Sequence, residues 1–323
     1  MSTELAKRRG SLMKSESKQK LLAFSSLLVM IIVFSIASPN FATFSNFVGI
    51  LLSTAVVGIL ATGVTFIIIT GGIDLSIGTV MTFCSVIAGV LITFWGLPIW
   101  VGVAGAILSG MMAGLINGLL ISKMRLPAFI ATLGMQMIAA GLNLVISGSR
   151  PIYFLHEPKF RLIAMGTLFG IPYSVFLFFG LAIIASIVLG RTVFGRYTYS
   201  IGSNEEATRL SGINVDRWKI AVYVLGGFFY GVAGVVMASR LNSAQPALGV
   251  GYELEAIAAV VIGGASLSGG SGTILGTIIG AFIMSVLTNG LRILSIPQEW
   301  QTVVIGSIVI LAVYTDIIRR RKE

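Results

Sequence analysis

The sequence is poor in charged residues and has only one histidine and one cysteine. Just 11% of its 323 residues are Asp, Glu, Lys or Arg, whereas roughly 25% is usual in a soluble domain. Hydrophobic residues make up 56%, so most of the surface is expected to face lipid. A single cysteine, Cys84, excludes an internal disulfide and a multi-cysteine metal site. The single histidine, His156, argues against a histidine-based metal or catalytic cluster.

A phosphate-binding motif is also missing. No stretch matches G-x-x-x-x-G-K-[ST], and GGSGTILG at 269–276 has the glycines without the lysine. An intramembrane enzyme is disfavoured because the hydrophobic segments hold no clustered carboxylates from which to build an acid–base pair. We therefore predict a chain that is not an enzyme, binds no metal or cofactor, and depends on another protein for any use of ATP.

Long hydrophobic segments fill most of the remaining sequence. A membrane-spanning helix needs about 20 mostly apolar residues. We predict an all-α integral membrane protein with about ten transmembrane helices in one transmembrane domain, 21–318. The expected spans are 21–38, 47–69, 78–94, 99–121, 127–146, 173–189, 220–238, 254–262, 273–291 and 302–314. The segment 254–262 is too short to cross alone, so it is either a broken helix or part of a longer one.

The basic residues are distributed unevenly between the two sides of this topology. If both termini are cytoplasmic, seventeen of the 22 Lys and Arg residues lie inside, and five lie outside. This bias is the one that orients membrane proteins. It predicts a cytoplasmic basic segment at 1–20 and a cytoplasmic basic tail at 319–323. It also explains the net charge of +10 without nucleic-acid binding.

One hydrophilic segment interrupts the hydrophobic sequence. Seven charged residues lie within 195–219: Arg196, Glu205, Glu206, Arg209, Asp216, Arg217 and Lys219. Ser203 and Glu206 fit a capping box, Glu205 and Arg209 fit an i,i+4 ion pair, and Gly212 suits a helix C-terminus. The pattern predicts a helix of about two turns, Asn204–Ser211, at the membrane surface. A solvated loop that happens to be helical is the alternative.

Four stretches of the sequence resemble one family. They are NEEATRLSGI at 204–213 with the flanking GRYTYSIGSN, ITGGIDLSIG at 69–78, LPAFIATLG at 126–134, and SAQPALGVGYELEAIAAVVIGGASLSGGSGT at 243–273. Together they resemble the permease subunits of ATP-binding cassette (ABC) importers of the ribose and simple-sugar family. The resemblance covers the chain from about residue 67 to its end.

The resemblance implies a homodimeric, multi-pass protein of the bacterial inner membrane that translocates a monosaccharide, such as ribose, by alternating access. The implied partners are an ATP-binding subunit and a periplasmic or extracellular sugar-binding protein. Within the loop 191–219, the implied ATPase-coupling residues are Asn204, Glu205, Glu206, Ala207, Arg209, Leu210, Ser211 and Gly212. A self-sufficient ion-coupled transporter is the alternative, but such proteins carry buried ionisable residues, and Asp74 is nearly alone in the spans.

Other polar residues are candidates for the solute pathway or for docking. Asp74 is either an intramembrane gate residue or, as we favour, the N-cap of the third span. Thr132, Gln136 and Asn143 share one helix face, and either line a pathway or, as we favour, form interhelical hydrogen bonds. Three residues are expected at the outer face, where a binding protein docks: Gln245, Tyr252 and Glu253.

Regularly spaced glycines mark three of the expected spans. Glycines recur every fourth residue at 110, 114 and 118, at 227 and 231, and at 272, 276 and 280. Such spacing allows close helix packing in lipid, and we favour packing within the chain over a dimer interface. The segments 71–76 and 263–268 share the pattern Gly-Gly-x-x-Leu-Ser. They are either simple turns or breaks in helices near the pathway.

Overall fold

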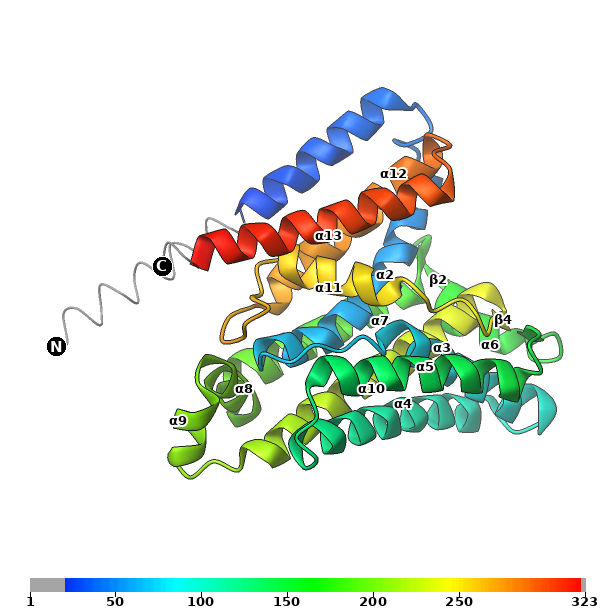
Figure 1. Ribbon diagram of the computed structural model, residues 1–323. Coiled ribbons are helices and arrows are strands. Elements are labelled where there is room, and N and C mark those ends of the chain that lie inside the picture. Colours follow the sequence, from blue (N-terminus) through cyan, green and yellow to red (C-terminus); the bar gives the residue numbers. More distant parts are fainter. Residues whose placement is uncertain (1–20, 321–323) are drawn as a thin grey trace.

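The computed structural model describes residues 21–320, which form a helical bundle (Figure 1). The helices are Leu21–Ala37, α2 Phe44–Ile69, α3 Ile77–Gly89 with the π-helical turn η1 Val90–Phe94, α4 Ile99–Ser122, α5 Ala128–Ser147, α6 Pro158–Met165, α7 Tyr173–Arg191, α8 Val193–Ser203, α9 Glu205–Leu210, α10 Val215–Leu241, α11 Tyr252–Ile262, α12 Ile274–Ile293 and α13 Gln298–Arg320. Two short antiparallel ladders pair β1 Ile152–Tyr153 with β4 Ser243–Ala244, and β2 Thr167–Leu168 with β3 Ile171–Pro172. These ladders leave the predicted all-α class unchanged.

Seven of the described helices are long and apolar enough to cross a membrane: α2, α3 with η1, α4, α5, α7, α10 and α12. The other three predicted spans correspond to Leu21–Ala37, α11 and α13. The 11 residues of α11 span only about 16 Å at 1.5 Å per residue, about half of a bilayer core. The count of ten spans therefore stays a prediction.

Two long helices form the centre of the bundle. Of the 18 most apolar consecutive residues of α2, 94% are buried inside the protein. Helix α10 packs against α2, α3 and α4. The glycines predicted to allow close packing do so within the chain. A Cβ added at Gly114 would lie 2.2 Å from the Tyr223 carbonyl oxygen, and one at Gly227 would lie 2.1 Å from the Gly110 carbonyl oxygen. The α4 and α10 backbones are thus in direct contact, which only glycine permits.

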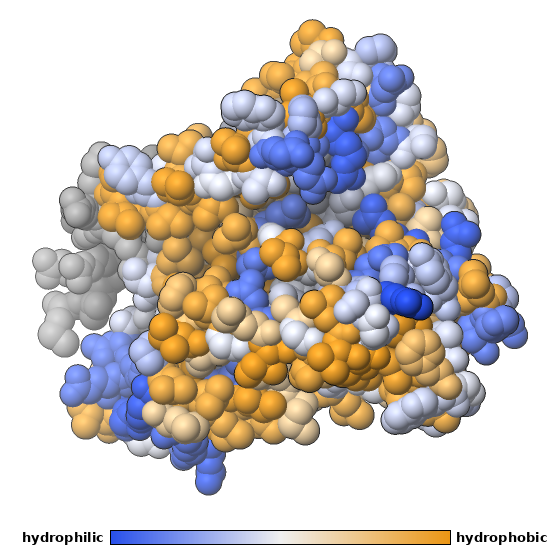
Figure 2. Space-filling view, turned by 45° about the vertical axis from the view of Figure 1, so that its right-hand side comes forward, coloured by the Kyte–Doolittle hydropathy of each residue, from blue (hydrophilic) through white to orange (hydrophobic). Residues whose placement is uncertain are grey.

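The outer helices present apolar side chains to their surroundings. On α5, Met137 and Val145 are 71% and 77% exposed, and on α7, Ile183 and Ile184 are about as accessible. Figure 2 shows that hydrophobic side chains cover much of the face of the bundle seen in that view. Exposed apolar surface of this extent suits contact with lipid.

The two described ends of the chain lie at the same end of the bundle as α9. In Figure 1, the start of Leu21–Ala37, the end of α13, and both α8 and α9 lie at one end of the bundle, with α6 and the two ladders at the other. We refer to these as the α9 end and the α6 end. The described chain ends and α9 therefore lie at the same end of the bundle, which is consistent with the topology that the charge distribution predicts. That this end is cytoplasmic stays a prediction.

Candidate functional site

The hydrophilic segment folds as two consecutive helices, α8 and α9. Asn204 separates them in an extended conformation, and its side-chain oxygen accepts a hydrogen bond of 2.9 Å from the Ala207 amide. The predicted capping box of Ser203 and Glu206 is wrong, because Ser203 is the last residue of α8. Gly212 adopts the predicted left-handed conformation, with φ of 83°. The predicted surface helix exists, shortened to Glu205–Leu210.

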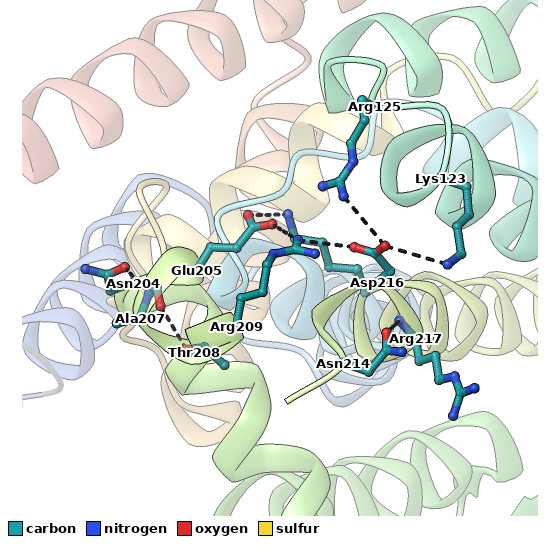
Figure 3. Close-up of polar contacts among 11 residues, drawn as sticks. Lys123, Arg125, Asn204, Glu205, Ala207, Thr208, Arg209, Asn214, Asp216 and Arg217 are labelled. Atoms are coloured by element: carbon teal, nitrogen blue, oxygen red, sulfur yellow. Dashed lines mark hydrogen bonds and ion pairs between the residues drawn. The ribbon is translucent and has the colours of Figure 1, made fainter. Parts of the chain in front are cut away.

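Ion pairs connect α9 to two other parts of the chain (Figure 3). Arg209 forms the predicted pair with Glu205, at 3.1 Å, and also contacts Asp216 on α10, at 3.2 Å. Asp216 in turn pairs with Lys123 at 3.6 Å and Arg125 at 3.7 Å, both in the α4–α5 connection. We call this cluster, together with Lys219, which pairs with Glu205 at 2.5 Å, the ionic network. It consists of Lys123, Arg125, Glu205, Arg209, Asp216 and Lys219.

The ionic network favours the charged form of Glu205. Its partial burial acts to raise its pKa, but hydrogen bonds and charges from Lys219 and then Arg209 outweigh that effect, so the pKa lies below its ordinary value of 4.5. Exposed ion pairs each contribute about 0.2–1 kcal/mol, and networks more than isolated pairs. The network therefore orients α9 on the end of α10 instead of leaving it as an independent surface helix.

The outward face of α9 is free of contacts with the rest of the described chain. Glu206, Ala207 and Leu210 are exposed, Leu210 to 84%, whereas Thr208 on the opposite face is buried. A single exposed leucine is common on protein surfaces. Here it lies on a capped and anchored helix beside Gly212, which is also exposed. This face can accept a partner without rearrangement of the chain.

Behind α9, the C-terminal end of α8 packs on the two Gly-Gly segments. A Cβ at Gly202 would lie 1.7 Å from the Ile69 carbonyl oxygen and 2.6 Å from the Gly270 amide nitrogen. Gly270 donates a hydrogen bond of 2.9 Å to that same carbonyl. The Tyr199 hydroxyl donates to the Gly272 carbonyl at 2.6 Å. A Cβ added at Gly71 would lie 3.5 Å from the Ser268 carbonyl oxygen. The segments 71–76 and 263–268, which the sequence links only by pattern, therefore meet directly behind the hydrophilic segment.

Asp74 is not the N-cap of α3, which corrects the interpretation favoured from the sequence. The N-cap is Ser76, and Asp74 is completely buried two residues earlier. One carboxylate oxygen accepts hydrogen bonds from the Ser76 amide at 2.8 Å and hydroxyl at 2.6 Å, and the other accepts from Tyr230 on α10 at 3.2 Å. Asn117 on α4 donates to the Ser76 hydroxyl at 3.1 Å. Asp74 thus joins the α2–α3 break to α4 and α10.

The polar face of α5 packs against neighbouring helices. Asn143 is buried and donates to the Thr79 carbonyl on α3 at 3.2 Å. Thr132 is also buried, with its hydroxyl 2.8 Å from the Ala128 carbonyl of its own helix. Gln136 donates to Glu253 on α11 at 3.3 Å. Asn143 and Gln136 therefore form the interhelical hydrogen bonds favoured from the sequence, whereas the closest contact of Thr132 is within its own helix. A role of these residues in a pathway stays a prediction.

The three predicted docking residues differ in accessibility. Glu253 is only 6% exposed, and it accepts hydrogen bonds from the Gly251 amide and from Gln136. Its side chain therefore turns inward and offers no surface to a partner, contrary to its predicted role. Tyr252 is partly buried, and Gln245 donates to the Ser243 hydroxyl at 3.0 Å. Sequence reasoning missed the contact between Gln136 and Glu253 because 117 residues separate them.

Comparisons with known proteins agree with this architecture. Residues 46–313 match the family described as branched-chain amino acid transport system / permease component. The ribose import permease protein RbsC of Escherichia coli K12 is 41% identical over 296 residues, covering 90% of this chain and 91% of that protein. RbsC of Bacillus subtilis is 42% identical, covering 92% of each chain. The L-arabinose ABC transporter permease protein AraH of Azospirillum brasilense is 36% identical, covering 92% of this chain and 87% of AraH.

Proposed function

The chain belongs to this permease family and to its simple-sugar ABC importer branch, and from this we propose that it is the membrane subunit that carries a monosaccharide inward. Pentoses are the first candidates, since the named relatives handle ribose and L-arabinose. The anchored and outward-facing helix α9 is the observation that carries the proposal. A transport subunit without an ATP site needs such an element to receive force from an ATPase.

In this mechanism, α9 is the contact for a separate ATP-hydrolysing subunit. Its exposed residues are the docking face, with Leu210 as the apolar contact and Glu206 as a charged one. The ionic network then passes movement of α9 to the start of α10 and to the α4–α5 connection. Because α10 contacts α2, α3 and α4, a small displacement at its end shifts the centre of the bundle.

A second connection runs through α8. Gly202 contacts Ile69, where α2 stops just before the first Gly-Gly segment, and Gly270, in the connection between α11 and α12 just after the second. Broken helices are the elements that rearrange in many transporters. We propose that α8 biases these breaks, so that ATP binding and hydrolysis alternate the side on which the pathway is open. Two states with different partner affinity are sufficient for this.

The remaining assignments follow from the same proposal. Two copies of the chain pair around a central pathway, because each copy supplies one coupling helix and two ATPase sites need two. The α9 end is cytoplasmic, and a sugar-binding protein docks at the α6 end of the bundle, near Gln245 and Tyr252. Asp74, Thr132, Gln136 and Asn143 hold the helices around the pathway. The membrane is the bacterial inner membrane, in which ABC importers work.

Co-purification tests the contact between α9 and the ATPase. Leu210→Asp places a charge on the docking face, whereas Leu155→Asp places the same charge on a leucine that is 71% exposed in the loop before α6. We expect Leu210→Asp to release the nucleotide-hydrolysing subunit and Leu155→Asp to retain it. Full sugar transport by the chain in liposomes without any ATPase, driven by an ion gradient, would overturn the proposal.

A further inference from the structure

A pocket of about 380 Å³, lined by both polar and apolar side chains, opens toward the α6 end of the bundle. Its walls come from α2, the end of α10, α11, α12 and α13. Ser285, eight residues before the end of α12 at Ile293, lines it. At 1.5 Å per residue the pocket therefore reaches about 12 Å into the bundle. Figure 2 shows hydrophilic side chains at the level of the α12–α13 turn, above a hollow in the surface.

The side chains of this pocket are chemically mixed. Arg240 and Arg292 bring two guanidinium groups, Glu255 brings a carboxylate, and Tyr252 brings an aromatic ring. Among the described residues, neither arginine lies within 4.0 Å of an acidic oxygen, and the contact of Arg240 with the Ser53 hydroxyl is long, at 3.5 Å. The hydrogen-bonding capacity of these charged groups is therefore mostly unused within the described chain.

Ser285 gives a second, independent indication of a ligand. Its side chain is 1% exposed, and its hydroxyl has no hydrogen-bond partner in the described structure. A buried hydroxyl without a partner costs about 1–3 kcal/mol, and such groups in native proteins usually have a reason. Since Ser285 lines the pocket, a ligand that offers a hydroxyl group supplies the missing partner.

We propose that this pocket is a transient binding site for the monosaccharide, occupied after the sugar leaves its binding protein and before it enters the pathway. The two guanidinium groups donate hydrogen bonds and the Glu255 carboxylate accepts them, and a neutral polyol, whose hydroxyls both donate and accept, hydrogen-bonds with both kinds of group. The aromatic ring of Tyr252 suits the apolar face of a sugar ring. The volume is near the lower end of the ~300–1,000 Å³ found for small-molecule sites.

This inference rests on the proposed function, and transport by the intact importer separates the two. The complex in liposomes, with its binding protein outside, is tested with a panel of pentoses and hexoses. We expect Ser285→Ala to raise the sugar concentration for half-maximal transport roughly 2- to 10-fold, the effect of one lost hydrogen bond. Arg292→Gln is expected to raise it about 10-fold, since hydrogen bonds to charged groups are stronger.

One matched control lies outside the pocket. Ser307 on α13 bonds to its own helix at the Val303 carbonyl, so Ser307→Ala should transport like the wild type. If both pocket variants also transport like the wild type, the pocket is not a sugar site and the proposed function stands. If the wild type transports no sugar in the panel, the proposed function fails and the inference with it.

A direct measurement uses the importer in lipid nanodiscs without its binding protein. Saturation-transfer NMR with the transported sugar as probe should show binding to the wild type and to Ser307→Ala, and reduced binding to Ser285→Ala. Competition by inorganic phosphate at millimolar concentration would instead identify an anion site and overturn the assignment.

Discussion

Replacement of Asp216 by Asn tests how firmly the ionic network holds α9. Asp216 contacts Arg209, Lys123 and Arg125, and its side chain is only 15% exposed. The contact with Arg209 is the shortest of the three, at 3.2 Å, and the two others are 3.6–3.7 Å. Only the pair with Arg209 joins Asp216 to α9, and an exposed pair contributes about 0.2–1 kcal/mol. The pairs with Lys123 and Arg125 instead hold the start of α10 to the α4–α5 connection.

The expected effect is local, because the core of the bundle does not depend on these side chains. A loss of about 1 kcal/mol, the upper end for this pair, raises the population of an opened α9 about fivefold. Hydrogen exchange of the amides in 205–210 should accelerate by about this factor in Asp216→Asn, while exchange in α2 is unchanged. Glu206→Gln is the matched control, since Glu206 is exposed and forms no ion pair in the described structure.

The salt dependence gives a second check on the same variant. Exposed pairs weaken with ionic strength, because the Debye length falls from about 10 Å at 0.1 M to about 3 Å at 1 M salt. Wild-type exchange in α9 should approach that of Asp216→Asn at 1 M salt. Equal exchange of both proteins at low salt would refute the idea that the network anchors α9.

Three further predictions concern other parts of the structure. The pKa of Glu205 is lowered in the folded state, so its contribution to stability is fully present above pH 4.5 and is lost as the pH falls through the folded pKa. After correction for intrinsic rates, hydrogen exchange in α9 should be steady from pH 7 to 5 and should become faster below pH 5. Gly227→Ala brings a methyl group to 2.1 Å from the α4 backbone and should destabilise the folded protein by about 1–3 kcal/mol, which would lower its melting temperature. Gly141→Ala is the control, because an added Cβ there meets nothing within 4 Å, and its melting temperature should not fall. Tyr230→Phe removes one of the three hydrogen bonds to buried Asp74 and should lower the free energy of unfolding by about 1–3 kcal/mol. Tyr314 is exposed, so Tyr314→Phe is the control, and equal melting temperatures of the two variants would contradict the prediction.

The sequence was informative wherever local chemistry decides the structure. Long apolar segments fixed the positions of the helices, and Gly212 and the Glu205–Arg209 pair were identified correctly because they depend on neighbours in the same turn. The predicted N-cap of α9 was wrong because Ser203 and Asn204 are both good N-cap residues, and the choice between them depends on how far α8 extends. Local pattern does not contain that information.

Contacts between distant segments were not predictable from one sequence. Asp74 accepts a hydrogen bond from Tyr230, which is 156 residues away. Asp216 forms ion pairs with residues of the α4–α5 connection, about 90 residues earlier in the chain. The glycine stripes indicated which helix faces pack closely, but not which helix they meet. The inward orientation of Glu253 likewise depends on Gln136, which a different helix supplies.

Photo-crosslinking from position 210 tests the central claim that α9 receives the force of ATP hydrolysis. A photoreactive amino acid is introduced at Leu210 or, as control, at Leu155, and the importer is illuminated in membranes. We predict a crosslink from position 210 to the nucleotide-hydrolysing subunit and none from position 155. A crosslink to that subunit from position 155 alone, or labelling of position 210 by a reagent confined to the outside of the cell, would contradict the account.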